Sequence, residues 1–290
     1  MAKARIGVSG WRYTPWRGVF YPEDLVQREE LAYASRQLAT IEINGSFYSL
    51  QRPSSYARWR DDTPRGFVFA VKAPRYITHI RRLRHAEEGL ANFFASGVLC
   101  LREKLGPILW QIPPSLRYHE EVLEEFLAQL PRDTESAADL ARRHSGLPKD
   151  RTAVETDQRR RLRHAMEVRH ESFRNPAFIA QLRRHRIALV VADTARRWPL
   201  LEDVTGGFIY LRLHGDKKLY SSGYTPAALH AWARRIHAWM RGAQPRDAHR
   251  AAPDSKAPER ASRDVYVYFD NDQKACAPFD AMSLAKLMQR

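Results

Sequence analysis

Eight short apolar segments, separated by stretches of helical periodicity, constrain the fold of this chain more than any other feature. Strands that alternate with helices predict a parallel sheet, because each return to the same edge of the sheet needs a crossover. Eight such units within 290 residues predict a single α/β domain, a closed TIM (β/α)8 barrel. The expected strands occupy residues 5–9, 40–44, 66–72, 107–112, 165–169, 188–192, 207–214 and 264–269. Helical spacing is clear in 28–38, 120–130, 176–185 and 226–240.

The turn after the first expected strand argues against an open, doubly wound sheet. It reads Ser9-Gly10-Trp11-Arg12-Tyr13 and lacks the GxGxxG phosphate loop of such sheets. Two further segments are longer than a bare barrel needs. Residues 131–160 are expected to form a long connection with a helix at 135–144. Residues 241–263 contain three prolines, many charges and almost no large apolar side chain, which predicts a disordered insertion within the domain.

The chain is strongly basic, with 48 Lys and Arg against 33 Asp and Glu and a net charge of +15. This surplus favours polyanionic partners such as nucleic acid. Arginines on solvated outer helices explain the same charge, and we prefer that explanation because runs such as 159–163 lie in expected helical or connecting segments.

The expected compartment is the cytoplasm. No run of about 18 apolar residues is present, so no membrane contact is expected, and no apolar segment near residue 1 indicates a secretory leader. The two cysteines, Cys100 and Cys276, lie far apart and form no CxxC pair. The sequence indicates no particular oligomeric state.

Polar side chains gather at the carboxyl ends of the expected strands, where the pockets of such barrels lie. Glu42 and Glu167 are expected to form an acid/base pair, because a buried carboxylate raises the pKa of its neighbour. Lys72 is placed among the catalytic residues and could also clamp a phosphate or carboxylate. His214 is expected to move a proton.

Substrate-binding residues are expected at the same strand ends and in the loops that follow them. They are Trp11, Asn44, Tyr48, His79, Gln111, Arg169, Asp193, Arg212, Tyr268, Asn271 and Asp272. A structural network of salt bridges that fills the barrel would use the same charged residues. Their concentration at one end of the strands favours a binding pocket instead.

No cofactor is expected from the sequence. Neither HExxH nor another spaced ligand motif occurs, and no GxSxG turn indicates a serine nucleophile. A divalent metal stays an alternative, since carboxylates and His214 are available as ligands. Lys72, Arg169 and Arg212 would repel such a cation, so no metal ligand is assigned.

Motifs at all eight strand ends follow one another in a specific order. They are Gly7-Val8-Ser9-Gly10-Trp11, Glu42-Ile43-Asn44 with Ser46-Phe47-Tyr48, Ala70-Val71-Lys72-Ala73-Pro74 with Thr78-His79, Gln111-Ile112-Pro113-Pro114, Glu167-Val168-Arg169-His170, Ala192-Asp193, Arg212-Leu213-His214-Gly215 and Tyr268-Phe269-Asp270-Asn271-Asp272. In this combination the chain resembles the YecE-like family, domain of unknown function 72, over nearly its whole length.

The resemblance implies a TIM barrel and supplies no established reaction. Nucleic-acid binding is suggested for the family by the similarity of its barrel to those of repair nucleases, which is an analogy of fold. Two positions depart from the family pattern. Asp270 stands where asparagine is usual, which adds a negative charge near the mouth, and Phe173 stands where tryptophan is common.

These features lead us to expect an enzyme that acts on an anionic, phosphorylated substrate, with a phosphodiester in nucleic acid as one form of it. Two alternatives stay open: a non-catalytic nucleic-acid-binding barrel, and a metal-free isomerase, lyase or hydrolase for a small anionic metabolite. Positive charge that continues from the pocket to its rim would favour nucleic acid. Positive charge confined to the helix layer would argue against it.

Overall fold

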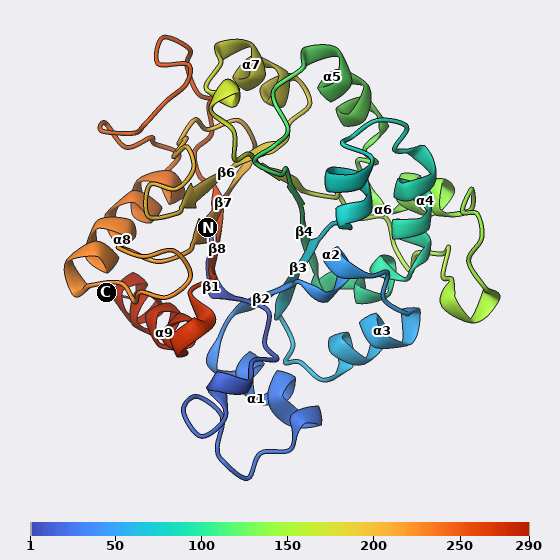
Figure 1. The fold of residues 1–290 in the computed structure, drawn as a ribbon, viewed down its shortest axis with the longest axis horizontal. Helices are drawn as coiled ribbons and strands as arrows, with labels where there is room; N and C mark the ends of the chain where they lie inside the picture. Colours follow the sequence, from blue (N-terminus) through green and yellow to red (C-terminus); the bar gives the residue numbers. More distant parts are fainter. Residues whose placement is uncertain (1, 290) are drawn as a thin grey trace.

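The barrel is closed by eight parallel strands in the order β1 to β8 (Figure 1). The computed structural model describes residues 2–289. The strands are β1 Ala4–Ser9, β2 Thr40–Ile43, β3 Val68–Lys72, β4 Leu105–Gln111, β5 His164–Glu167, β6 Ala188–Asp193, β7 Phe208–Leu213 and β8 Asp264–Phe269. The prediction of a (β/α)8 barrel is confirmed, and each strand ends no more than two residues from its expected limit.

Helices surround the barrel and bury one face against it. The α-helices are α1 Glu30–Gln37, α2 Gly45–Tyr48, α3 Pro53–Asp61, α4 Glu87–Ala95, α5 Glu120–Gln129, α6 Thr134–Ala141, α7 Pro176–Arg184, α8 Pro226–Met240 and α9 Cys276–Met288. Short turns of 3-10 or π geometry are η1 Thr14–Trp16, η2 Gln27–Glu29, η3 Tyr76–Ile80, η4 Val98–Lys104, η5 Lys149–Arg151, η6 Glu171–Phe173 and η7 Asp272–Lys274. Within residues 2–289, no helix combines the length and apolar character that a membrane crossing requires.

Local sequence explains where several helices begin. Thr225 precedes α8 and its hydroxyl accepts a hydrogen bond from the backbone N–H of Ala228, while Pro226 occupies the first helical position. Asn175 and Pro176 begin α7 in the same way. The helix expected at 135–144 is α6, which a reciprocal capping box between Asp133 and Ser136 shifts slightly toward the amino terminus.

The interior of the barrel is filled below the carboxyl ends of the strands. Tyr210 and Tyr268 lie there with ring centroids 4.9 Å apart, and the hydroxyl groups of Tyr268 and Thr40 are 2.9 Å apart. Smaller apolar residues such as Leu109 and Val190 complete this layer. Because strand residues alternate between interior and exterior, the next inward residues toward the carboxyl ends form the layer above. That layer consists of the polar residues predicted for the site.

The connection between β6 and β7 has no helix, and part of the 241–263 segment packs against it. The Glu202 carboxylate accepts a hydrogen bond from the His249 N–H at 2.8 Å. The Asp203 carboxylate accepts from the N–H groups of Ala251 and Ala252 at 2.7 and 3.0 Å, and both alanines are buried. The segment contains neither helix nor strand. Its predicted disorder stays a prediction, but the contacts show that its middle covers a side of the barrel.

Candidate active site at the mouth of the barrel

A buried arginine on β7 joins three carboxylates at the mouth of the barrel. The guanidinium of Arg212 donates to Glu42 at 2.8 Å, to Glu167 at 2.7 Å and to Asp270 at 2.9 Å. The hydroxyl of Tyr210 donates to the second carboxylate oxygen of Glu42 at 2.5 Å. These contacts bring together the inward-facing charges that the alternation of strand residues predicted.

The pKa of Glu167 differs from the sequence-based expectation. Burial alone would favour the protonated acid, but Arg169 and Arg212 hold the pKa of Glu167 well below its usual range. Arg169 Nε lies 2.6 Å from one carboxylate oxygen and Arg212 contacts the other. Arg212 lies between the two carboxylates, and the pKa of Glu167 is lowered where the sequence led us to expect that Glu42 would raise it. Glu167 is therefore ionised at neutral pH, which does not suit it to donate a proton, and its predicted catalytic role stays a prediction.

The carboxyl ends of β7 and β8 supply three titratable groups with shifted pKa values. Arg212 and His214 lower the pKa of Asp270 to about 2 despite its burial. Burial and the Asp270 charge raise the pKa of Asp272 well above its usual value, which favours the neutral acid. Burial and Arg212 lower the pKa of His214. Two carboxyl groups in different environments thus take opposite protonation states.

His214 lies 3.0 Å from Asp270 through its Nδ1 atom, yet neither ring nitrogen has a well-oriented hydrogen bond within residues 2–289. A buried imidazole without partners is costly unless a ligand or water contacts it. Asp270 was not among the predicted site residues. The signal that could have identified it was its departure from the asparagine usual in the YecE-like pattern.

Lys72 and His79 form the second part of the mouth. The Lys72 ammonium lies 4.2 Å from the centre of the Phe47 ring, which contacts His79 edge-on at 5.0 Å. In the described part of the chain no carboxylate pairs with the Lys72 ammonium, and burial and the Arg212 charge lower its pKa to about 8. Burial and the charges of Lys72 and Arg169 lower the pKa of His79 to about 4.

Arg169 carries positive charge from the network toward solvent. Its Nε atom binds Glu167, while its guanidinium stacks on Trp198 at 3.9 Å. Its two terminal nitrogens form no hydrogen bond within residues 2–289. Stacking leaves these nitrogens available in the guanidinium plane, so they can donate to the oxygens of an anion.

Two predicted binding residues contact the two parts of the mouth. Asn44 donates through Nδ2 to the Ser9 hydroxyl at 2.9 Å, and that hydroxyl also contacts Glu42 and Arg212. The Asn44 Oδ1 atom is buried without a partner in the described chain. Gln111 Nε2 lies 3.5 Å from His79 Nε2. Asn44 therefore has an unused acceptor at the mouth and Gln111 lies beside His79, while their predicted substrate contacts stay predictions.

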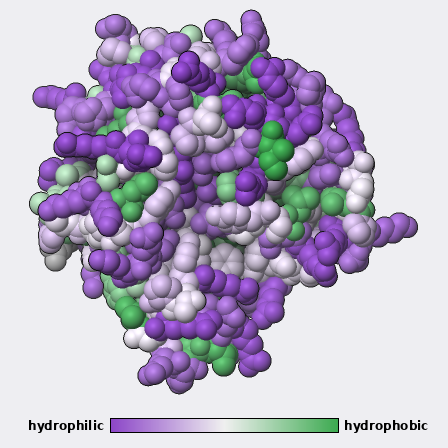
Figure 2. Space-filling view, viewed as in Figure 1, coloured by the Kyte–Doolittle hydropathy of each residue, from purple (hydrophilic) through white to green (hydrophobic). Residues whose placement is uncertain are grey.

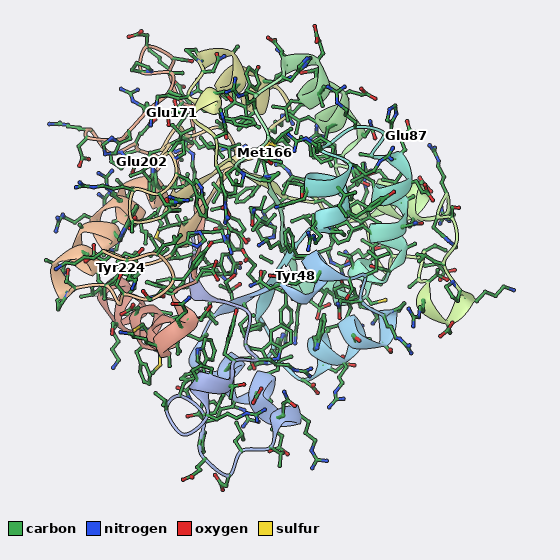
Figure 3. All side chains as sticks on the ribbon, viewed as in Figure 1. Tyr48, Glu87, Met166, Glu171, Glu202 and Tyr224 are labelled. Carbon is green, nitrogen blue, oxygen red and sulfur yellow. The ribbon has the colours of Figure 1, made fainter. Side chains whose placement is uncertain are left out.

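Five predicted residues lie away from this centre. Trp11 is buried against Trp59 with ring centroids 5.3 Å apart, and Tyr268 lies in the layer below. Asn271 Nδ2 donates to Ser222 and to Asp280, which connects the β8 end to α9. Asp193 accepts from the Tyr224 hydroxyl at 3.0 Å, on the side of α8 and α9 (Figure 3). Tyr48 is 72% exposed on α2 at the rim. The predicted substrate contacts of these residues stay predictions.

Positive charge continues from the mouth to the rim on one side. The loops 73–86 and 112–119, which follow β3 and β4, contain five arginines and no aspartate or glutamate. These arginines are Arg75, Arg81, Arg82, Arg84 and Arg117. The space-filling view shows mostly hydrophilic residues, with hydrophobic residues in small separate patches (Figure 2). Part of the positive charge therefore lies in loops at the carboxyl ends of the strands, and the preference for the outer helices as its main location stays a prediction.

The carboxylates of the network are arranged around a guanidinium rather than around a metal. Within residues 2–289, no three His, Cys, Asp or Glu side chains gather as metal ligands would. Arg212 contacts three acidic side chains that a divalent ion would need. A metal would have to compete with this arginine, so no residue is assigned as a metal ligand.

A family model described as "Protein of unknown function DUF72" matches residues 5–290. The UPF0759 protein YecE of Escherichia coli K12 is 30% identical over 127 residues, which cover 43% of this chain and 44% of that protein. The UPF0759 protein YunF of Bacillus subtilis is 28% identical over 114 residues, 38% of this chain and 39% of that protein. These matches span less than half the length of either relative.

Solved structures show the same fold. A DUF72 family protein from Thermotoga maritima matches with a TM-score of 0.74 and 22% identity, covering 99% of this chain and 100% of that one. A DUF72 family protein from Enterococcus faecalis matches with a TM-score of 0.69 and 17% identity, covering 99% and 96%.

Proposed function

Because this chain belongs to the DUF72 family, for which no reaction is established, we propose from the site itself that it is an enzyme acting on a phosphorylated substrate. The phosphate group binds at the barrel mouth beside Lys72 and Arg169. His214 accepts and Asp272 donates a proton during cleavage of a phosphate ester. This division of roles differs from the acid/base pair of Glu42 and Glu167 that the sequence suggested.

One observation carries the proposal: Lys72 is a buried cation without an anionic partner in residues 2–289. Burying an unpaired charge is unfavourable, and an anionic ligand would remove the penalty. The terminal nitrogens of Arg169 and the Gln111 amide are further donors at the same mouth. Three donors of this kind match the oxygens of a phosphate group.

Neutral His214 removes a proton from a water molecule as the water oxygen attacks phosphorus. The bond between phosphorus and the ester oxygen breaks, and neutral Asp272 supplies the proton to the leaving alcohol. Arg169 and Lys72 stabilise the charge on the phosphoryl oxygens. Ion pairs with Glu42, Glu167 and Asp270 fix the position of Arg212 and so stabilise the structure of the mouth.

We call the proposed phosphate site of Lys72, Arg169 and Gln111 the Lys72 clamp. Calorimetry of the binding of inorganic phosphate to the intact protein tests this site. Lys72→Met should weaken phosphate binding by about tenfold or more, because a charge-assisted hydrogen bond is lost. Lys286→Met changes an exposed lysine on α9 and serves as the matched control. Unchanged phosphate affinity in a folded Lys72→Met protein would overturn the proposal. Turnover of a chromogenic phosphate diester should fall at least a hundredfold in Asp272→Asn and in His214→Asn, with intact folding.

A further inference from the structure

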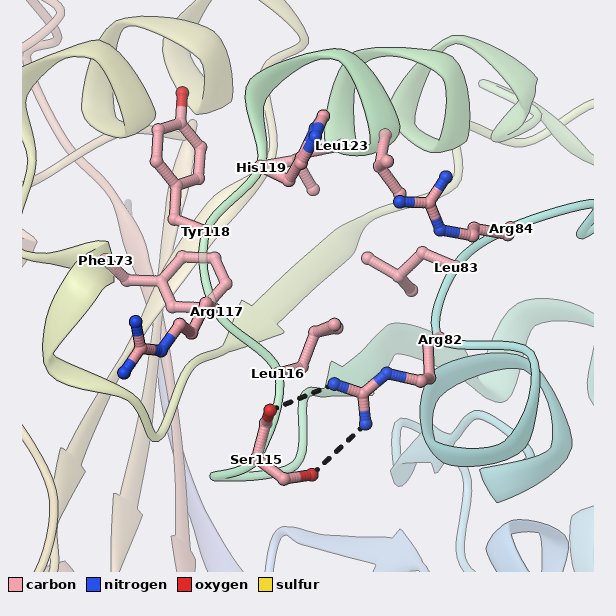
Figure 4. Close-up of a pocket in the computed structure, with 11 residues that line it drawn as sticks. Arg82, Leu83, Arg84, Ser115, Leu116, Arg117, Tyr118, His119, Leu123 and Phe173 are labelled. Carbon is pink, nitrogen blue, oxygen red and sulfur yellow. Dashed lines mark hydrogen bonds between the residues drawn. The ribbon is translucent and has the colours of Figure 1, made fainter.

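A cavity of about 300 Å³ lies at the rim, between the loops that follow β3 and β4 (Figure 4). It is lined by Arg82 and Arg84 from the first loop and by Arg117 and His119 from the second. Leu116 and Phe173 form part of its apolar wall. The cavity belongs to neither the ion network nor the Lys72 clamp, and the proposed reaction does not use it.

The two loops are joined through one arginine. Arg82 donates to the backbone oxygen of Ser115 at 2.9 Å and to its hydroxyl at 3.3 Å (Figure 4). Arg82, Leu83 and His85 all have left-handed backbone conformations, with φ of 52°, 68° and 48°. Such conformations are costly for residues other than glycine and persist only where the surroundings impose them. The buried Leu83 side chain and its N–H bond to Ile77 at 3.0 Å hold the loop in place.

The cavity is positively charged. Three arginines and a histidine line it, and no acidic side chain does. Neither Arg84 nor Arg117 forms a salt bridge within residues 2–289. Outside the lining, Glu121 on α5 lies 3.4 Å from His119. Like charges held together in one concave space favour an anion, and arginine matches phosphate oxygens well.

Another part of the same loop is aromatic and exposed. A groove of about 470 Å³ lies there, lined by Tyr48, Tyr76 and Ile80 among others. The exposed fractions of these three side chains are 72%, 44% and 61%. Loop 73–86 thus contributes residues both to a basic cavity and to an aromatic groove. Phosphates on arginines and bases stacked on aromatic rings are the two contacts that single-stranded nucleic acid makes with proteins.

We propose that the rim cavity binds a backbone phosphate of a single-stranded nucleic acid, with bases of the same strand stacked on Tyr48 and Tyr76. This inference rests on the proposed function and specifies its substrate: the phosphate at the Lys72 clamp and the phosphate in the rim cavity belong to one strand. A ligand with a single phosphate would occupy the clamp alone.

Fluorescence anisotropy with a labelled single-stranded RNA of mixed sequence, added to the full chain, tests the inference. The double variant Arg84→Ala/Arg117→Ala should bind at least tenfold more weakly and show a shallower dependence on salt, because two phosphate contacts are lost. Arg82 is left intact because it joins the loops. Tyr48→Ala should bind about fivefold more weakly through lost stacking.

The matched control is Arg65→Ala/Arg161→Ala, which removes two exposed arginines that precede β3 and β5 at the other end of the barrel. Its RNA affinity should stay within twofold of the original. If the control loses as much affinity as the rim variant, binding is a general effect of positive charge and the inference is wrong. Unchanged affinity in a folded rim variant also overturns it.

Two further measurements separate this inference from the proposed function. Lys72→Met should weaken the binding of inorganic phosphate at the mouth and should also weaken RNA binding, because one strand contacts both places. If Lys72→Met leaves phosphate affinity unchanged while Arg84→Ala/Arg117→Ala still weakens RNA binding, the proposed function is wrong and the rim inference stands. Inorganic tripolyphosphate should compete with RNA weakly. If it competes as strongly as unlabelled RNA, and Tyr48→Ala binds RNA normally, the rim binds a phosphate chain and the assignment to nucleic acid is wrong.

Discussion

Asp270 and Arg212 form an ion pair of 2.9 Å between the carboxyl ends of β8 and β7. The pair places an ionised carboxylate where its charge raises the pKa of Asp272 and supports a positive charge on His214. The two groups to which we assign proton transfer therefore both depend on one aspartate, at the position where the resembling family usually has asparagine.

Asp270→Asn should reduce stability at neutral pH and flatten its dependence on acid. The folded pKa of about 2 lies below the ordinary value of 3.8, so the charge stabilises the fold above about pH 4 and this stabilisation is lost as the pH falls toward 2. The expected loss at pH 7 is on the order of 1–2 kcal/mol, because Asn keeps an acceptor for Arg212. Denaturant unfolding between pH 3 and 7 measures it. An equal loss at both ends of this range would contradict the assignment.

Lys72→Met should stabilise the protein even though it removes phosphate binding. The pKa of Lys72 falls from 10.5 to about 8, so the unfavourable burial of its charge is fully present below pH 8 and is relieved as the pH rises toward 10.5. Methionine has a similar volume, and the expected gain at pH 7 is about 1–3 kcal/mol. Denaturant unfolding at pH 7 and pH 10 should show the variant's advantage shrinking at the higher pH. A less stable variant at pH 7 would indicate a hidden partner for Lys72.

Arg212→Met should be the most damaging single change at the mouth. It leaves Glu42, Glu167 and Asp270 buried without their shared counter-charge, and we expect a loss of about 3–5 kcal/mol at pH 7. The loss should diminish below pH 5 as the carboxylates become protonated. Arg212→Lys keeps the charge and should recover part of the stability, as unfolding midpoints would show. A loss below 1 kcal/mol in Arg212→Met would mean that the network contributes little.

Asp203→Ala should release the middle of the 241–263 segment. The carboxylate accepts two backbone N–H groups, from Ala251 and Ala252, and no other described side chain contacts those groups. Amide hydrogen exchange at these two residues should become at least tenfold faster, and trypsin should cut sooner after Arg250. Exposed Asp254 provides the control, as Asp254→Ala. Fast exchange in the unaltered protein would confirm the predicted disorder and contradict the contacts.

The sequence predicted the barrel closely because strand and helix periods are local properties of the chain. Inward phase along the strands also placed Glu42, Glu167 and Arg212 together correctly. The sequence could not show which of these charged side chains contact one another across the barrel. A guanidinium from β7 lies between Glu42 and Glu167, and this depends on contacts between residues 45 and 170 positions apart along the chain.

Loop residues were harder to place for a similar reason. We expected Asn271 in the pocket because it lies next to other site residues along the chain. The backbone turns after β8, however, and the Asn271 side-chain amide donates to Asp280 on α9. The rim arginines were noted only as part of a basic composition. Their convergence depends on left-handed backbone at Arg82 and Leu83, which no periodic pattern indicates.

The layer of Tyr210 and Tyr268 beneath the ion network has a kinetic consequence. Side chains fill the described interior at that depth, so nothing can pass through the barrel from end to end. A reaction product must leave by the route the substrate used to enter, past the same rim. Product should therefore compete with substrate for the free enzyme, and a long strand that slides off slowly would make release, rather than bond cleavage, the step that limits turnover.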